Sequence, residues 1–132
     1  MSNTQYFFDT YALFEIVRGV KEYEKYASMN GITTIFNIAE LNLNLKKSLS
    51  ETEADALTTK AFNQTIPVTL EDIQKAMTFK KKHTKLSIPD CVGYMTALKY
   101  GFLFLTGDED FKHLPNVHFV NTRTKEDFLN VA

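Results

Sequence analysis

The sequence predicts an α/β fold in which helices cover both faces of a mainly parallel, twisted sheet. Its strand-like segments are short apolar runs, without the polar alternation of a strand that has one face in water. Segments with a helical spacing of apolar residues separate these runs. Strands that alternate with helices and are apolar on both faces are typical of a parallel sheet between two helical layers.

The strand-like runs lie at both ends of the chain and near its middle. Residues 5–9, QYFFD, form the first, and residues 102–106, FLFLT, form the most strand-like one. The β-branched run ITTI at 32–35 predicts another strand. TIPV at 65–68 and VHFV at 117–120 are shorter candidates. We expect these segments to pair in one sheet.

Helical patterns fill the segments between the runs, and several have a recognisable start or stop. Gly19 and Gly101 are suited to end two of the helices. Asn37 and Glu40 match a capping pattern in which Asn caps the helix and Glu takes its third position. We expect helices over residues 10–19, 21–29, 37–49, 50–62, 70–83 and 87–101.

The composition predicts one folded domain over residues 1–132. Hydrophobic residues make up 44% of the chain, with 11 Phe and 6 Tyr, which is ample for a single core. The net charge of −1 gives no global positive field, so nucleic-acid binding would depend on local patches or metal ions. The single cysteine, Cys91, excludes an internal disulfide and fits a reducing compartment. With no export signal or membrane span evident, we expect a cytoplasmic protein.

Four acidic residues occur where a parallel sheet would gather them. Asp9 ends the first strand, Asp108 follows FLFLT, Glu40 lies in the helix after ITTI, and Asp90 begins the helix before FLFLT. Ligands of such sheets bind beyond the carboxyl ends of the strands. Carboxylates that converge there repel each other, and a bound Mg²⁺ or Mn²⁺ relieves the repulsion. Such ions activate water and stabilise the charge on a phosphoryl group, which is the chemistry of phosphodiester hydrolysis.

Three of these acids also have an ordinary structural explanation. Glu40 fits a capping box with Asn37, Asp90 fits a partner of the helix dipole, and Asp108 fits a turn or cap residue. Asp9 is different, because an Asp that closes an apolar strand has no obvious structural use. The functional interpretation of the sequence therefore depends most on Asp9.

Four segments in order carry a family resemblance: FFDTYALFEI around Asp9, FNIAELNL around Glu40, IPDCVGYMTALKYG around Asp90 and FLFLTGDEDF around Asp108. They resemble the PIN domain, and in particular the VapC-type toxins of toxin–antitoxin pairs. The resemblance extends from about residue 6 to residue 120; no single segment is specific, but the ordered set is. It implies a three-layer α/β/α PIN-like fold with a central, mainly parallel sheet.

The resemblance also implies an activity and partners. It implies a Mg²⁺- or Mn²⁺-dependent endoribonuclease that cuts RNA with metal-activated water, forms a homodimer and is controlled by a cognate antitoxin. By position, four residues resemble the family's catalytic and metal-binding acids: Asp9, Glu40, Asp90 and Asp108. Three more resemble accessory groups, two of them hydroxyls that orient water and one an outer ligand: Thr10, Thr106 and Asp110.

Two residues after Asp90 depart from the family pattern. Cys91 and Gly93 stand where small aliphatic residues are usual, and a glycine inside a helix costs roughly 1 kcal/mol relative to alanine. The chain has two arginines, Arg18 and Arg123, so phosphate binding would fall mainly to lysines. The candidates lie just before Asp90, and a solvated helix end is the alternative explanation for them: Lys80, Lys81, Lys82 and Lys85.

Other side chains give weaker signals. The histidines show no ligand spacing with one another or with Cys91, so we expect surface or packing roles and no zinc site for His83, His113 and His118. Three aromatic residues in the early helices fit either a groove for a partner or core packing: Phe14, Tyr23 and Tyr26.

Two other functions compete with the nuclease. One is a PIN-like scaffold that binds RNA or protein without cutting it. The other is an aspartyl-phosphate enzyme or receiver domain, which also places an Asp after an early parallel strand. A phosphatase of that kind would need a second Asp two residues later, where this chain has Tyr11, and receivers need an acidic pair and a late Lys that are missing here.

Overall fold

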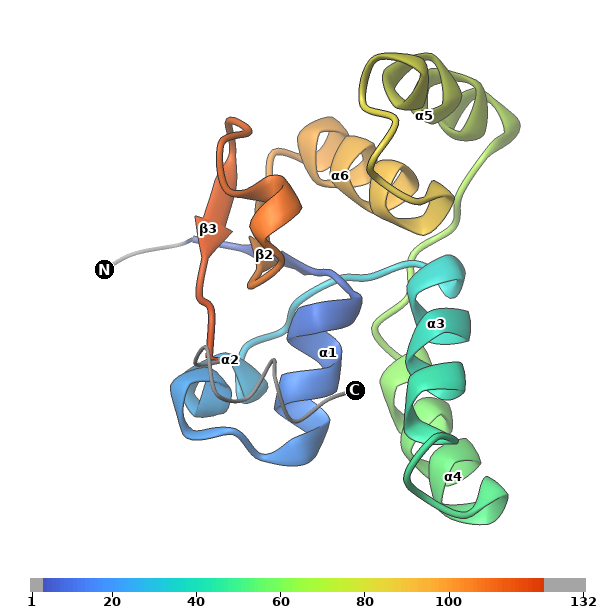
Figure 1. Cartoon of the computed structure of the whole chain (residues 1–132), viewed down its shortest axis with the longest axis vertical. Helices are drawn as coiled ribbons and strands as arrows, with labels where there is room; N and C mark the ends of the chain where they lie inside the picture. The colour runs from blue at the N-terminus through green and yellow to red at the C-terminus, as the bar shows by residue number, and fades with distance from the viewer. Residues whose placement is uncertain (1–3, 123–132) are drawn as a thin grey trace.

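The sheet is parallel throughout the part of the chain that the structure, a computed structural model, describes, namely residues 4–122. Its strands lie in the order β1 (Tyr6–Phe8), β2 (Leu103–Thr106) and β3 (Val117–Phe119). Figure 1 labels β2 and β3 side by side. Phe8 pairs with Leu105, so the two ends of the domain meet at the sheet. The carboxyl ends of β1 and β2 therefore lie side by side, as the sequence predicts.

Two hydrophobic cores pack on opposite faces of the sheet. Because side chains alternate along a strand, Phe8 and Leu105 enter one core while Phe7 and Phe104 enter the other. All four side chains are essentially inaccessible to solvent. The alternation of two buried faces confirms the expected three-layer α/β/α arrangement.

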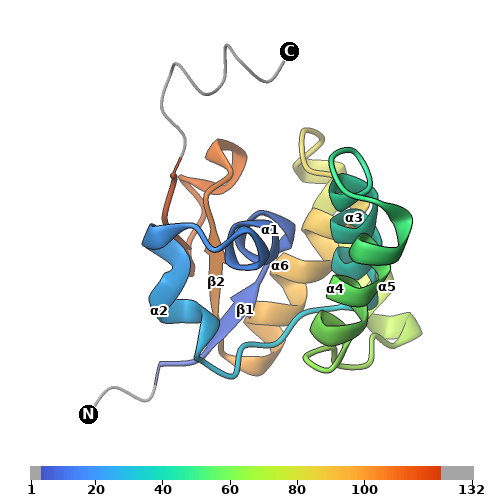
Figure 2. The same ribbon diagram turned by 90° about the horizontal axis from the view of Figure 1, so that it is seen from below.

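A different set of helices covers each of the two cores. The first core lies under α1 (Thr10–Arg18), the short η1 (Lys21–Tyr23) and α2 (Glu24–Ala27), and the antiparallel pair α3 (Ile35–Leu45) and α4 (Glu51–Phe62). The second lies under α5 (Leu70–Lys82) and α6 (Ile88–Tyr100). Figure 2 shows α3 beside α4, and α3 also contacts α1 and α6. No helix within residues 4–122 is long and apolar enough to cross a membrane.

Helix ends follow the local signals closely. Gly19 and Gly101 adopt the left-handed conformation that ends α1 and α6. Ser87 and Asp90 form a complete capping box at the start of α6. The predicted helix at 21–29 is shorter than expected, because it divides into η1 and one turn of α2.

The strand predicted at 32–35 is wrong, as is the one at 65–68. Only isolated bridges form there, between Phe7 and Ile32 and between Thr33 and Thr65. The physical reason is that Thr34 caps α3 by accepting a hydrogen bond from the Asn37 N–H at 3.4 Å, which places Ile35 inside the helix. Asn37 is therefore not the cap, and the predicted capping box with Glu40 does not exist.

Gly93 has a packing role that accounts for its place inside α6. A Cβ atom at this position would lie 2.9 Å from Cε1 of Phe7 and 3.5 Å from Oδ1 of Asn37. The glycine lets α6 approach β1 and α3 closely, so its propensity cost is offset by tight packing.

Candidate functional site

The structure brings Asp9, Asp90 and Asp108 within electrostatic range near the carboxyl ends of β1 and β2, with Glu40 in range of Asp90. Asp9 follows β1, Asp108 follows β2, Asp90 lies in the first turn of α6, and Glu40 lies in the second turn of α3. The charges of Asp90 and Asp108 act on Asp9, and the charge of Glu40 acts on Asp90. Residues separated by up to 99 positions in the sequence thus share one acidic site.

Asp9 is the most deeply buried of the four, with 3% of its surface exposed. Burial raises the pKa of its carboxyl group well above the usual value, against hydrogen bonds from Thr106 and the Ala12 N–H that lower it. The Ala12 N–H donates to Oδ1 at 2.9 Å, so Asp9 caps α1. The expectation that Asp9 has no structural use is therefore wrong: it caps a helix and contributes to the acidic site.

Asp90 also combines a capping role with a perturbed carboxyl group. Its Oδ2 accepts a hydrogen bond from the Ser87 N–H at 2.9 Å. Burial raises the pKa of Asp90 to about 6, and the charges of Glu40 and Asp108 contribute to the rise. The first turn of α6 thus holds a carboxylate that the rest of the site makes costly to ionise.

Asp108 caps the short helix η2 (Glu109–Phe111), since its Oδ1 accepts from the Asp110 N–H at 3.0 Å. Burial raises the pKa of Asp108, and the neighbouring Asp110 and Glu109 charges add to the rise. Asp110, the predicted outer ligand, is exposed on the first turn of η2.

Thr106 connects two of the acids. Its hydroxyl oxygen accepts a hydrogen bond from the Asp108 N–H at 3.0 Å, and the same hydroxyl bonds the Asp9 carboxyl group. Because a carboxylate only accepts, the Thr106 proton is directed to Asp9. This fully buried side chain at the end of β2 therefore fixes the positions of Asp9 and Asp108 together.

Thr10 connects a third acid to Asn37, which the sequence indicated only as a helix cap. Its hydroxyl donates to Oε1 of Glu40 at 2.7 Å and accepts from Nδ2 of Asn37 at 3.2 Å. Asn37 is 1% exposed. The only sequence signal for it is its position three residues before Glu40, on the same face of α3.

The lysine run differs from residue to residue. Lys80 donates to the backbone carbonyl of Leu86, and its charge acts on the buried thiol of Cys91, the residue after Asp90. Lys81, Lys82 and Lys85 are exposed. The run therefore lies near the start of α6, with three side chains in solvent.

The aromatic and histidine side chains with weaker sequence signals pack against or bond neighbouring residues. Tyr23 and Tyr26 are buried in the first core, which confirms the packing interpretation for these two residues. Phe14 is partly buried and lies under the Arg18 guanidinium. His118 bonds the Tyr26 hydroxyl at 2.8 Å, and His83 stacks on Phe79.

A further buried acid, Glu15, lies outside the predicted set. It pairs with Arg18 at 3.0 Å, and its other carboxylate oxygen accepts a hydrogen bond from Thr122. These contacts hold the segment after β3 against α1, which is a structural use of a buried carboxylate.

The acidic site fits a divalent cation by its chemistry. Asp9, Asp90 and Asp108 offer oxygen atoms, which Mg²⁺ and Mn²⁺ prefer, and a cation would relieve their mutual repulsion. Within residues 4–122, no three acidic, His or Cys side chains lie close enough to ligate one ion as they stand.

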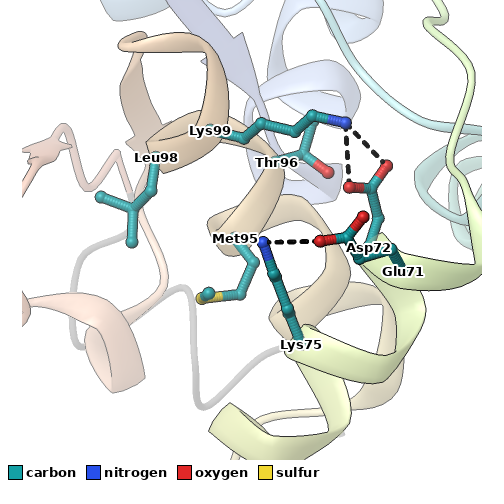
Figure 3. Close-up of a pocket in the computed structure, with 7 residues that line it drawn as sticks. All are labelled: Glu71, Asp72, Lys75, Met95, Thr96, Leu98 and Lys99. Carbon is teal, nitrogen blue, oxygen red and sulfur yellow. Dashed lines mark hydrogen bonds and ion pairs between the residues drawn. The ribbon is translucent and has the colours of Figure 1, made fainter.

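A pocket elsewhere on the domain has a different character. It measures about 330 Å³ and lies between α5 and the last turns of α6, at the opposite end of that helix from Asp90. Figure 3 shows two ion pairs in its lining: Lys99 of α6 with Asp72 of α5, and Lys75 with Glu71 within α5. The N–O distance is 3.0 Å in each pair. The four charged residues that line this pocket are therefore paired with one another.

The chain belongs to the PIN-domain family. The model of that family, described as the PIN domain, matches residues 6–117. Members of this family are generally nucleases. The match includes all four acids and both threonines of the site.

Solved structures show the same fold. A chain in a toxin–antitoxin complex from Klebsiella pneumoniae is 20% identical with a TM-score of 0.67, over 89% of this chain and 100% of that one. A second similar chain belongs to VapBC2 from Rickettsia felis, solved in complex with a DNA fragment from its promoter. It is 14% identical with a TM-score of 0.67, over 91% of this chain and 100% of that one. No match was found among curated proteins.

Proposed function

We propose that the protein is a Mg²⁺- or Mn²⁺-dependent endoribonuclease and the toxin of a toxin–antitoxin pair, acting on RNA in the cytoplasm. The observation that carries the proposal is the acidic site itself. In a chain of the PIN family, Asp9, Asp90 and Asp108 lie at one edge of a parallel sheet and raise the energy of one another's charged forms. Purely structural acids do not need to converge in this way.

The residues divide the chemistry between them. Asp9, Asp90 and Asp108 would hold the cation, with Glu40 beside them, and Asp110 at the rim would act as an outer ligand. A divalent ion held here would supply Lewis acidity and would lower the pKa of a bound water molecule. Thr106 keeps Asp9 and Asp108 in register through its two hydrogen bonds. Glu40, held at Oε1 by Thr10, would orient the attacking water and take its proton as the water oxygen bonds to phosphorus. The phosphorus–oxygen bond to the leaving sugar would break, and the departing oxygen would take a proton from solvent.

We propose three binding partners: an antitoxin, a second copy of the chain and RNA. One similar solved chain belongs to a toxin–antitoxin complex and another to VapBC2, and we propose an antitoxin for this protein as well. A groove of about 470 Å³ between α1, α2 and α4, with Leu13, Ile16 and Leu57 in its lining, offers an apolar surface for such a partner. A second copy of the chain is the other expected partner. Lys81, Lys82 and Lys85 would contact RNA phosphates.

The decisive experiment compares two conservative variants on a mixed RNA pool with Mn²⁺, with Mg²⁺ and with EDTA. Asp9→Asn removes one charge but keeps an oxygen that can cap α1. Asp55→Asn removes an exposed acid of α4 that pairs with Lys46 and serves as the control. We expect cleavage that EDTA abolishes, a loss on the order of 100-fold or more in Asp9→Asn, and parental activity in Asp55→Asn.

The competing function is a PIN-like scaffold that binds RNA or protein without cutting. The absence of three close ligands among residues 4–122 is the observation in its favour. Under that function Asp9→Asn would bind RNA or a partner protein as the parent does, and the parent would bind no Mn²⁺. Mn²⁺ titration of the two proteins without RNA separates the two functions directly.

A further inference from the structure

A directed chain of hydrogen bonds runs from the cap of α3 to the Glu40 carboxylate. The Thr34 hydroxyl donates to Oδ1 of Asn37 at 2.7 Å, Nδ2 of Asn37 donates to Thr10 at 3.2 Å, and Thr10 donates to Oε1 of Glu40 at 2.7 Å. Thr34 and Asn37 are buried, with 0% and 1% of their surfaces exposed. These three hydrogen bonds therefore link a buried helix cap to a carboxylate at the acidic site.

The direction of each bond is set by the one before it. Thr34 already accepts from the Asn37 N–H, so its hydroxyl proton is free to donate to Oδ1. With Oδ1 turned to Thr34, the amide nitrogen of Asn37 is turned to Thr10. Thr10 then has one proton, and that proton goes to Glu40, which as a carboxylate can only accept.

Helix capping alone does not account for Asn37. The cap of α3 uses the Thr34 oxygen and the Asn37 backbone, whereas the Asn37 side chain reaches across to the first residue of α1. Asn42, on the same helix, makes the matching bond to a threonine, Thr58 of α4, and thereby joins two helices away from the acidic site. Asn42 is only half-buried and also donates to Oδ1 of Asp55 at 2.9 Å, and neither of its bonds leads to the acidic site.

We infer that Asn37 is a positioning residue of the acidic site, which fixes Glu40 through Thr10. This inference rests on the proposed function. The bond from Thr10 occupies Oε1, and Oε2 of Glu40 accepts no hydrogen bond from the part of the chain that the structure describes. One carboxylate oxygen is thus held in place and the other is left for the cation or its water. The Thr10 proton, being used on Glu40, is not available to orient water directly.

The test measures Mn²⁺ affinity without RNA, by electron paramagnetic resonance, in Asn37→Leu and in the matched control Asn42→Leu. Groups that hold a metal ligand in place through a hydrogen bond commonly contribute about 10- to 100-fold in affinity or activity. We expect Mn²⁺ to bind about 10-fold or more weakly to Asn37→Leu and within about 2-fold of the parent to Asn42→Leu. With RNA, kcat should fall in Asn37→Leu while KM stays near the parental value.

A double-mutant cycle tests whether Asn37 acts through Thr10. Thr10→Val removes the hydroxyl that links the two groups, and Thr10→Ser keeps it. We expect Thr10→Ser to match the parent, Thr10→Val to match Asn37→Leu, and the double variant Asn37→Leu/Thr10→Val to be no worse than either single change. Melting curves check folding, and Asn37→Ala provides a smaller substitution if Asn37→Leu does not fold.

Each result has a defined meaning. Equal Mn²⁺ affinities in Asn37→Leu and Asn42→Leu, or additive losses in the double variant, would overturn the inference while leaving the nuclease proposal intact. A parent protein that neither binds Mn²⁺ nor cleaves RNA would overturn the proposed function, and the positioning role of Asn37 with it. The inference is supported if Mn²⁺ binds more weakly to Asn37→Leu than to Asn42→Leu, and if the losses from Asn37→Leu and Thr10→Val do not add in the double variant.

Discussion

Asp90→Asn is predicted to stabilise the metal-free protein at neutral pH while it removes a cation ligand. Burial, together with the charges of Glu40 and Asp108, raises the pKa of Asp90 from 3.8 to about 6. At 1.36 kcal/mol per pKa unit, ionising Asp90 in the folded protein costs about 3 kcal/mol of stability at pH 7. Water that reaches this partly exposed group reduces the figure, so about 3 kcal/mol is an upper limit.

The pH dependence follows from the sign of the shift. Because the folded protein binds this proton more tightly than the unfolded chain does, stability is greatest below about pH 4 for this group and falls as the pH rises to about 6. Asn cannot ionise, so its advantage should be present at pH 7.5 and absent near pH 4. The amide oxygen of Asn can still accept the Ser87 N–H bond, which keeps the cap of α6.

Thermal unfolding in EDTA at pH 4 and pH 7.5 measures the effect. For a domain of this size, 1 kcal/mol corresponds to roughly 3 to 5 °C in Tm. In EDTA, we expect Asp90→Asn to melt several degrees above the parent at pH 7.5 only. With Mn²⁺ in place of EDTA, the Tm of the parent should rise and the Tm of Asp90→Asn should not. Asp55→Asn, whose parent carboxyl has a pKa lowered by Lys46 and Asn42, should show no gain. A Tm for Asp90→Asn at or below the parental value at pH 7.5 would refute the reasoning.

Three further predictions concern other positions. Thr106→Val, which removes the hydroxyl between Asp9 and Asp108, should reduce nuclease activity about 10- to 100-fold, with Thr106→Ser near the parent; equal activity of the two variants in a cleavage assay would contradict this. Gly93→Ala should lower stability by about 1–3 kcal/mol in urea unfolding, because its Cβ would meet Phe7, and a more stable variant would show that the helix moves aside. Replacing both Lys81 and Lys82 by Ala should raise KM for RNA and lower the slope of log affinity against log salt by about 1.4, and an unchanged slope would exclude phosphate contacts.

The sequence predicted the architecture well wherever the signal was local. The ends of α1, α5 and α6 depend on a cap or a glycine a few residues from the helix, and these ends lie within one or two residues of their expected places. The strand expected at 32–35 failed because its threonines suit a strand and a helix cap equally. Pairing with β1 along its whole length would have been needed to decide for the strand, and only one bridge forms, at Ile32.

The amino-acid sequence alone determined which side chains can take part in the acidic site. These are acids after two apolar runs, an acid at a helix start, and threonines next to them. The tertiary structure decided what each does. Thr106 joins Asp9 to Asp108, and Asn37 reaches Glu40 by way of Thr10, because β1, β2 and α3 pack together. Caps and turns are set by atoms within about four residues, whereas these hydrogen bonds and the raised pKa values arise from burial between segments far apart in the sequence.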